Sequence, residues 1–197
     1  MKRSRVVAPA ALALSTALVL TACGSSTGNQ SGAGTSSAPA ASSSAPSETG
    51  FGSDPSGVEV TGGFGDTPVV TIGDETAGVT QMQVIDLVEG TGVAVEPGAT
   101  VLANYAGYGA TTKKQFDSSF DRGQPTPFGL DQVIKGWTEG IPGMKTGGRR
   151  LLIIPGDLAY GANPPSSDIK PNEVLVFVVD LVNFIQPGET EPVNPVQ

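Results

Sequence analysis

The chain lacks the side chains that most enzymes use for proton transfer and covalent catalysis. Its 197 residues include no histidine and a single cysteine, Cys23. The commonest general base, the Ser–His and Cys–His nucleophile pairs and most zinc sites are therefore excluded. One cysteine also allows no disulfide within the chain. Any chemistry must use carboxylates, lysines or tyrosines, or proceed without proton transfer, and we expect no metal and no cofactor.

The only tryptophan, Trp137, lies in the stretch Val133–Ile141, VIKGWTEGI. Val133, Ile134 and Trp137 have the spacing i, i+1 and i+4, which predicts that they share one side of a short helical turn. Gly136 and Gly140 have no side chains and give this turn a small cross-section, and Pro142 ends it. A large indole on such a helix can form the floor of a cavity, although a buried structural tryptophan is the alternative.

Charge excludes one class of partner. The formal net charge is −8, and removal of Lys2, Arg3 and Arg5 with a cleaved leader changes it to −8 − 3 = −11. Binding to a phosphate backbone needs a basic face, so we expect no nucleic-acid partner. The length suits one ordinary domain with additional segments.

The first 23 residues predict export and lipid attachment. Three basic residues precede a short apolar run, and Leu20-Thr21-Ala22-Cys23 matches a bacterial lipobox. We expect residues 1–22 to be a signal peptide of the lipoprotein type and Cys23 to carry the lipid. The protein would then be extracytoplasmic and anchored to the bacterial cell membrane. The alternatives are an ordinary cleaved signal or a transmembrane anchor, for which the apolar run is short.

Composition divides the remainder of the chain. Residues 23–57 are rich in Ser, Ala, Gly and Pro and are expected to form a flexible tether. Residues 58–80 lead into the domain and could add a strand at Pro68–Ile72. The domain itself is expected at 81–187, and the end of the chain, 188–197, is expected to be loose.

The domain shows the pattern of several strands and one helix. The strands are predicted at Met82–Val88, Thr100–Gly107, Thr126–Leu130, Arg149–Ile154 and Val174–Ile185. The two arginines that begin the fourth strand are interpreted as a solvated strand end. The predicted fold class is α+β, with a curled antiparallel sheet of about five strands over one short α-helix.

Five motifs occur in a characteristic order: NYAGY, QFDSSFDRG, QVIKGWTEGIPGMKTGGRR, IPGDLAYGA and NEVLVFVVDL. Together they resemble the FKBP family, the macrolide-binding peptidyl-prolyl cis-trans isomerases. The resemblance covers residues 81–186. It implies a half-wrapped sheet with the helix in its concave face and a shallow apolar pocket between them.

The resemblance also implies roles for individual residues. The pocket residues implied in catalysis are Tyr105, Phe116, Asp117, Trp137, Tyr160 and Phe177. The residues implied in substrate binding are Arg122, Val133, Ile134 and Ile169. Of these, Arg122 steadies Asp117, the Ile134 backbone N–H donates to a substrate carbonyl, and Ile169 lies on a long flap. The implied partners are proline-containing polypeptides and macrolide inhibitors, and a monomer is expected.

The implied reaction suits a chain without histidine. Resonance gives the peptide C–N bond a rotation barrier of ~18–20 kcal/mol. The cis and trans forms of an Xaa–Pro bond are nearly balanced, so the barrier limits their exchange. The rotating state has less charge separation than the planar amide, and an apolar pocket should favour it. No nucleophile, metal or general base is required.

The sequence departs from the family pattern at the pocket rim. Thr126 stands where a pocket aromatic is common, and Gln132 stands where an acidic residue often lies. The flap, residues 163–172, carries Pro165 and Asp168 at positions that often contact a macrolide. These departures affect the expected substrate range and macrolide affinity.

Two other functions are compatible with the same residues. In the first, the pocket captures a proline-containing peptide with little turnover. In the second, the chain is a structural surface lipoprotein whose aromatic residues form a closed core, with no cavity at Trp137. The expected function is isomerisation of Xaa–Pro bonds in exported proteins.

Overall fold

The computed structural model describes residues 57–193, and residues 1–56 and 194–197 are not described. The predicted signal peptide, the lipid site at Cys23 and nearly all of the predicted tether lie outside this range. Between residues 57 and 193, no helix is long and apolar enough to cross a membrane.

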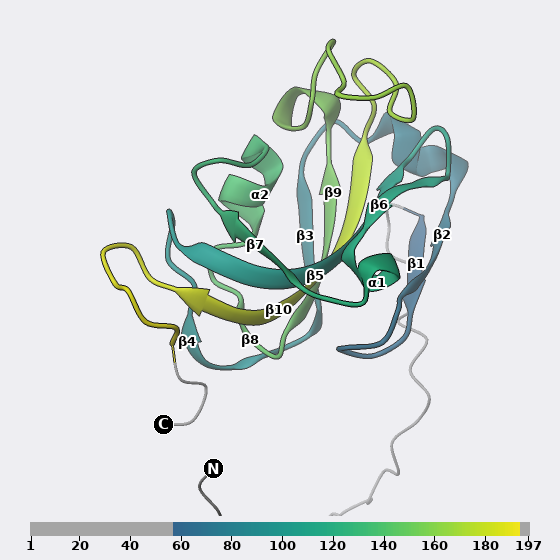
Figure 1. The fold of residues 1–197 in the computed structure, drawn as a ribbon. Coiled ribbons are helices and arrows are strands. Elements are labelled where there is room, and N and C mark those ends of the chain that lie inside the picture. The colour runs from purple at the N-terminus through teal and green to yellow at the C-terminus, as the bar shows by residue number, and fades with distance from the viewer. Residues whose placement is uncertain (1–56, 194–197) are drawn as a thin grey trace, which may run out of the picture. The chain divides into compact units, whose positions relative to one another are not determined.

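Six antiparallel strands form the main sheet (Figure 1). Five follow the order β3-β9-β10-β5-β6, and β7 also pairs with β5. Their bounds are β3 Gln83–Val88, β5 Thr100–Gly109, β6 Gln115–Ser118, β7 Thr126–Gly129, β9 Arg149–Ile154 and β10 Leu175–Ile185. The predicted α+β class with an antiparallel sheet is confirmed.

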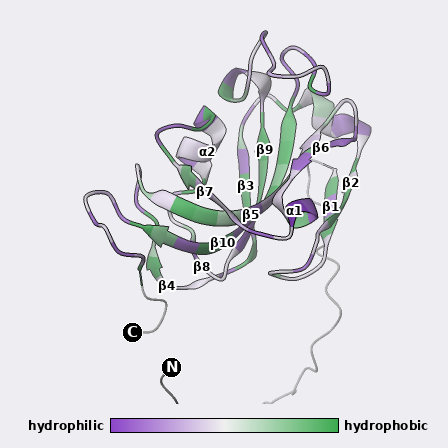
Figure 2. Cartoon of the chain, in the orientation of Figure 1, coloured by the Kyte–Doolittle hydropathy of each residue, from purple (hydrophilic) through white to green (hydrophobic). Residues whose placement is uncertain are grey.

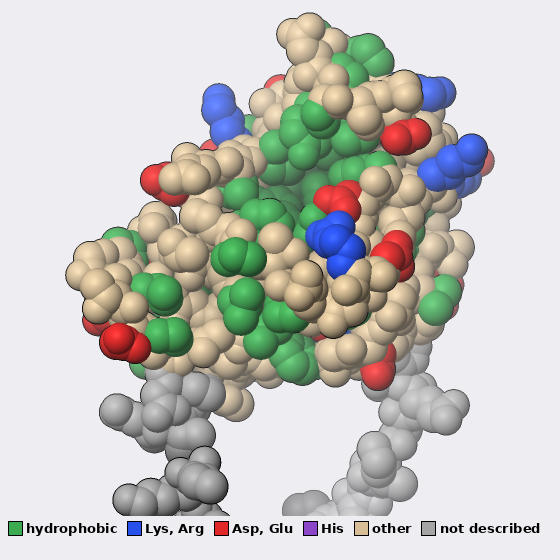
Figure 3. Space-filling view, viewed as in Figure 1, with side chains coloured by type: hydrophobic (Ala, Val, Ile, Leu, Met, Phe, Trp, Pro, Cys, Tyr) green, Lys and Arg blue, Asp and Glu red, His purple; other side chains and the backbone are tan. Residues whose placement is uncertain are grey.

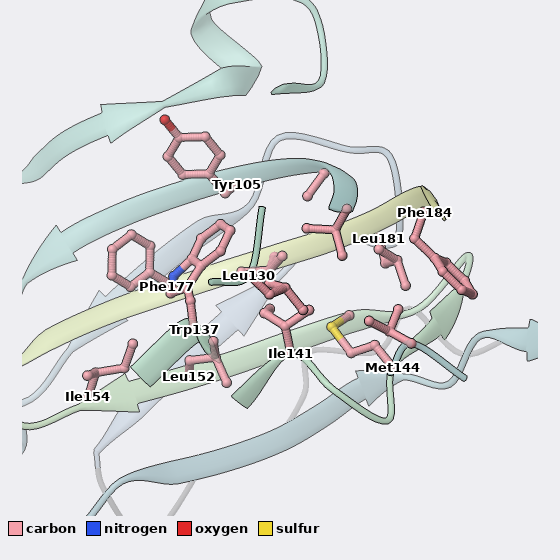
Figure 4. Packing of buried hydrophobic residues seen from close by; sticks show 14 of the residues in the cluster. Tyr105, Leu130, Trp137, Ile141, Met144, Leu152, Ile154, Phe177, Leu181 and Phe184 are labelled. Atoms are coloured by element: carbon pink, nitrogen blue, oxygen red, sulfur yellow. The ribbon is translucent and has the colours of Figure 1, made fainter. Parts of the chain in front are cut away.

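Strands β9 and β10 are buried on both faces, which explains their nearly continuous apolar sequences (Figure 2). Their side chains alternate between two apolar clusters. In β9, Leu152 and Ile154 join the cluster that contains Trp137, while Leu151 and Ile153 join the other. The sheet therefore has a core on each side, and Figure 4 shows the cluster around Trp137.

Helix α2, Lys135–Gly140, packs directly on β9. A Cβ atom at Gly136 would come within 2.4 Å of the Ile154 side chain, and one at Gly140 within 2.8 Å of Leu152. Only glycine allows the helix to lie this close to the sheet. The two glycines thus determine the depth at which the helix holds Trp137.

The predicted shared helical face is wrong in one detail. Ile134 precedes the helix in extended conformation, with φ −61° and ψ 149°, and Val133 lies before it. The Ile134 carbonyl accepts the first hydrogen bond of the helix, from Trp137 N at 2.9 Å. The i, i+1, i+4 spacing cannot reveal that the chain turns at Ile134.

The segment before the domain forms a hairpin of its own. Strands β1, Val58–Thr61, and β2, Val69–Ile72, pair antiparallel with each other, and a short 3₁₀ helix, η1, Asp74–Gly78, follows. The added strand expected at this place is therefore half of a separate two-stranded sheet. Its apolar side chains Val58 and Ile72 belong to the cluster on the side of the sheet away from α2.

Arg149 and Arg150 are buried, so their interpretation as a solvated strand end is wrong. Arg149 pairs with Asp180 on the adjacent strand β10, and both side chains are 0% exposed. Its guanidinium also donates to the Gly62 carbonyl at 2.7 Å and the Asp66 carbonyl at 2.6 Å, both in the β1–β2 turn. The ion pair therefore joins the hairpin to the main sheet.

Short elements complete the fold. They are the paired strands β4, Thr91–Ala94, and β8, Lys145–Thr146, the helix α1, Ser119–Arg122, and the 3₁₀ helix η2, Gly156–Leu158.

The first part of the segment expected to be loose is ordered. Val193 donates its backbone N–H to Phe184 at 2.9 Å and packs against the core. The segment from Gly188 to Val193 therefore returns to the domain.

Candidate active site

A cavity of about 410 Å³ opens over Trp137. Figure 3 shows a hollow with hydrophobic side chains on its floor and an acidic and a basic group at one edge. Eight predicted site residues line the cavity: Tyr105, Phe116, Asp117, Val133, Ile134, Trp137, Tyr160 and Phe177. The alternative of a closed aromatic core, with no cavity at Trp137, is wrong.

Aromatic rings hold Trp137 from three sides. Tyr105, Phe128 and Phe177 meet it edge to face, with ring centroids at 5.7, 5.0 and 5.5 Å. Figure 4 shows Trp137 next to Tyr105 and Phe177. Edge-to-face contacts add to the stabilisation from burial. The floor of the cavity is therefore a rigid, apolar surface.

A glycine in β5 makes room for the two phenylalanine rings that form one wall of the cavity. Phe116 from β6 and Phe177 from β10 meet edge to face at 5.6 Å. A Cβ atom at Gly107 would lie 2.7 Å from each of these rings. A larger residue there would move both rings, so Gly107 shapes the cavity although it does not line it.

Asp117 is held in a network with Tyr105 and Arg122 at the rim. The Tyr105 hydroxyl donates to Asp117 Oδ2, and Arg122 Nη1 donates to Asp117 Oδ1 at 2.6 Å. Arg122 Nη2 also donates to the Tyr105 hydroxyl at 2.9 Å. Arg122 does not line the cavity, but it binds two residues that do. The carboxylate is thus occupied by two donors.

Helix α1 places Arg122 in this network. The helix begins after Ser118, whose Oγ accepts from the Phe120 N–H at 3.2 Å and caps the helix. The helix is therefore capped by Ser118 and not by Asp117, the residue before it. Ser119 Oγ accepts from the Tyr105 N–H at 2.8 Å and ties the helix to β5.

The network keeps its members in fixed charge states. Burial raises the pKa of Asp117, but hydrogen bonds from Tyr105 and Arg122 outweigh burial, and the net pKa lies below the ordinary value of 3.8. Burial, followed by the hydrogen bond to Asp117, raises the pKa of Tyr105 above 10.0. Burial, and then the charge of Asp117, also raises the pKa of Tyr160. Near neutral pH the carboxylate is charged and both hydroxyls are protonated.

One backbone donor at the cavity is unused. Within residues 57–193, no group accepts a hydrogen bond from the Ile134 N–H, whereas the Ile134 carbonyl is engaged by helix α2. Tyr160, from the loop after η2, is 37% exposed and brings a hydroxyl to the same cavity. A ligand in the cavity can therefore meet two hydrogen-bond donors beside an apolar floor.

Ile169 lies elsewhere than expected. It is 4% exposed, belongs to the core cluster and is not among the residues that line the cavity. The resemblance implied a flap side chain in contact with substrate. Here the side chain instead anchors the flap in the core, because the flap turns inward at this residue.

Sequence reasoning missed one residue of the cavity, Phe128, and named another, Gln132, only as a departure from the family pattern. Thr126 was assigned to the position of a pocket aromatic, but Phe128 provides the ring and contacts Tyr105 at 5.4 Å. Both lie in β7, two residues apart and hence on one face of the strand. Period-two alternation from Thr126 could have indicated Phe128.

A second hollow, of about 210 Å³, lies beside Asp86 and Arg150. The Arg150 guanidinium already donates to the Asp86 carboxylate and to the carbonyls of Gly140 and Pro142. Residues 57–193 contain no group of three or more Asp, Glu, Cys or His side chains that could hold a metal ion. The cavity over Trp137 therefore remains the candidate active site.

Comparisons with known proteins point to one family. The sequence profile of a family described as FKBP-type peptidyl-prolyl cis-trans isomerase matches residues 92–182. A probable FK506-binding protein of Corynebacterium glutamicum is 45% identical over 98 residues, which cover 50% of this chain and 82% of the relative. An FK506-binding protein of Streptomyces anulatus is 48% identical over 100 residues, covering 49% of this chain and 81% of the relative.

A third relative is matched over nearly its whole length. The FK506-binding protein of Neisseria meningitidis serogroup B is 44% identical over 103 residues, which cover 51% of this chain and 94% of the relative. With the matched profile and the cavity around Trp137, these identities lead to one conclusion: the chain belongs to the family of FKBP-type peptidyl-prolyl cis-trans isomerases.

Proposed function

We propose that this isomerase rotates Xaa–Pro bonds in the cavity over Trp137 by desolvation and positioning, without covalent or acid–base catalysis. The observation that carries the proposal is an apolar floor of edge-to-face rings beside the unused Ile134 N–H. The side chains that line the cavity include neither histidine nor cysteine.

Desolvation acts on the charge distribution of the amide. The planar bond owes its barrier of ~18–20 kcal/mol to resonance, which places partial charges on nitrogen and oxygen. Rotation removes that resonance and much of the charge separation. Water solvates the planar form better than the rotating form, so an apolar aromatic cavity that excludes water when the peptide fills it lowers the barrier between them.

Positioning comes from the groups around the floor. The prolyl ring would lie on Trp137, the Ile134 N–H would donate to a substrate carbonyl, and the Tyr160 hydroxyl would hold the flanking chain. Each carboxylate oxygen of Asp117 already accepts a hydrogen bond, from Tyr105 or from Arg122, so the residue would serve as a polar rim and not as a base. A macrolide would occupy the same cavity.

The test is the exchange rate of an Xaa–Pro peptide, measured by NMR exchange spectroscopy with and without the protein. We expect cis–trans cross-peaks at catalytic protein concentration and their loss when a macrolide is added. An Xaa–Ala peptide is the matched control and should not bind. Peptide binding without faster exchange, on several Xaa–Pro peptides, would favour the alternative of a binding module with little turnover.

The mechanism predicts a flat pH profile. We expect kcat/KM to vary by less than about twofold between about pH 6 and about pH 9, because no group at the cavity titrates there. The lowered pKa of Asp117 means that its stabilising charge is present above the ordinary pKa and is lost as pH falls through the lowered one. Activity should therefore decline only in strong acid. A bell-shaped profile centred near neutrality would indicate an acid–base step.

The proposed site of action is outside the cytoplasmic membrane. The lipobox Leu20–Cys23 supports lipid attachment at Cys23, and a tether of residues 23–57 would give the domain reach toward emerging exported proteins. We propose that the protein works there as a lipid-anchored monomer.

A single substitution tests the anchor. We expect Cys23→Ala to remove the label from cells grown with a radioactive fatty acid and to move the protein out of the membrane fraction. In this proposal Cys23 alone carries the lipid that holds the protein at the membrane, so loss of this residue should release the protein. Ser25→Ala, two residues further on, is the control and should keep both label and location. Labelling that persists in Cys23→Ala would exclude this anchor.

A further inference from the structure

A buried carboxylate outside the cavity joins two loops. Glu173 lies between the flap, Asn163–Asn172, and strand β10, and it is 5% exposed. Its Oε1 accepts from the backbone N–H groups of Thr111 and Thr112 at 3.1 and 3.0 Å. Its Oε2 accepts from the Lys170 N–H at 2.6 Å. One side chain thus holds both the β5–β6 turn and the flap.

This arrangement is specific for a carboxylate. Burial of a charge is unfavourable unless hydrogen bonds compensate it. No lysine or arginine within residues 57–193 forms a salt bridge with Glu173, so backbone N–H groups alone hold its charge. A Cβ atom at Gly109 would lie 2.5 Å from Glu173 Oε1. The turn therefore leaves room for this group and for little else.

The flap connects Glu173 to the cavity. Asn172, the preceding residue, has φ +56°, a left-handed conformation that asparagine adopts more readily than most residues other than glycine. Its N–H donates to the Gly161 carbonyl at 2.7 Å. Gly161 follows Tyr160, whose ring lines the cavity. The other end of the flap also returns there, since the Asn163 N–H donates to the Tyr160 carbonyl at 3.4 Å.

We propose that Glu173 is a positioning residue of the isomerase, which fixes the flap and thereby holds Tyr160 at the mouth of the cavity. Glu173 affects the Kd for the Xaa–Pro peptide more than it affects the isomerisation rate at saturating peptide. Without it, the Tyr160 loop spends part of its time in conformations that cannot bind, and apparent affinity falls in proportion. The floor and its rings stay in place, so a bound peptide rotates as before. The inference rests on the proposed function of the cavity.

The substitution Glu173→Gln tests the proposal. Glutamine keeps one oxygen for the two threonine N–H groups but turns an amide N–H toward that of Lys170. Peptide affinity is read from the emission of Trp137, the only tryptophan, and turnover from NMR exchange at saturating peptide. We expect the Kd to rise roughly five- to tenfold and the saturated rate to change by less than about twofold. The exposed Glu189→Gln removes the same charge and should change neither.

A double-mutant cycle separates positioning from a general effect on stability. In a Tyr160→Ala background, Glu173→Gln should change the Kd by less than about twofold, because both substitutions act on one contact. An equal increase in both backgrounds would overturn the route through Tyr160.

A second substitution guards against a variant that does not fold. Gly109→Ala pushes a methyl group against the same carboxylate and should give the same rise in Kd. An unchanged Kd in an active, folded Glu173→Gln variant would overturn the inference alone. Absence of isomerisation by the unaltered protein would instead overturn the proposed function.

Discussion

Asp180→Ala is expected to lower the free energy of unfolding by about 3–5 kcal/mol, because it leaves the fully buried Arg149 guanidinium without its counter-charge. Asp180 Oδ2 accepts from Arg149 Nη2 at 2.8 Å and from the Gly65 N–H at 2.7 Å. The substitution therefore also releases the β1–β2 turn from the sheet. Urea denaturation followed by Trp137 emission measures the change.

Two controls define this result. Asp74→Ala removes an exposed partner of Lys113 and should cause no measurable change in stability, since exposed pairs contribute little. Limited proteolysis should cut Asp180→Ala in the β1–β2 turn faster than the unaltered protein. Unchanged stability and unchanged proteolysis together would mean that the hairpin does not depend on this ion pair.

Trp137→Leu is expected to lower kcat/KM for an Xaa–Pro peptide roughly 100-fold, which corresponds to ~2.7 kcal/mol in the barrier. Leucine preserves an apolar residue but removes the flat ring that Tyr105, Phe128 and Phe177 support. The floor becomes uneven, water enters beneath the prolyl ring, and the desolvation that favours the rotating amide is weakened. Protease-coupled isomerisation at low temperature measures the loss.

Loss of stability must be separated from loss of activity. Phe184→Leu alters the same core cluster, is 1% exposed and does not line the cavity. It should lower stability to a similar extent while kcat/KM stays within about twofold. If Trp137→Leu kept activity within about threefold of the unaltered protein, the indole could not be the surface on which rotation is accelerated.

The strands could be predicted because their patterns are local. Alternation in Thr100–Gly107 predicts that Val101, Ala103 and Tyr105 share one side of a strand, and the structure shows that this side of β5 faces the core. The glycines around Trp137 predicted a helical turn of small cross-section, and the structure adds that they allow the helix to lie close to β9. The order of the five motifs indicated most of the cavity residues through the resemblance to one family.

The errors arise where a partner lies far away in the sequence. Two arginines at a strand end resemble a solvated end, and nothing local shows that Arg149 on β9 lies beside Asp180 on β10. Thr126 and Phe128 share a face of β7, so only the register with β5 decides which of them reaches Trp137. Val193 follows a proline-rich segment, and its return to Phe184 depends on a completed sheet.

The place of the hairpin has a mechanical consequence. Leu151 and Ile153 pack toward β1 and β2, while Leu152 and Ile154 pack toward Trp137, so the described chain begins on the side of the sheet opposite the cavity. In the proposed anchored state, a pull from the membrane enters at Val58 and passes through the Arg149–Asp180 pair into the central strands. Helix α2 and the Trp137 cluster lie on the other side of the sheet. When a bound client pulls on the anchored enzyme, the load therefore falls on the β1–β2 hairpin. The cavity in which the Xaa–Pro bond rotates keeps its shape.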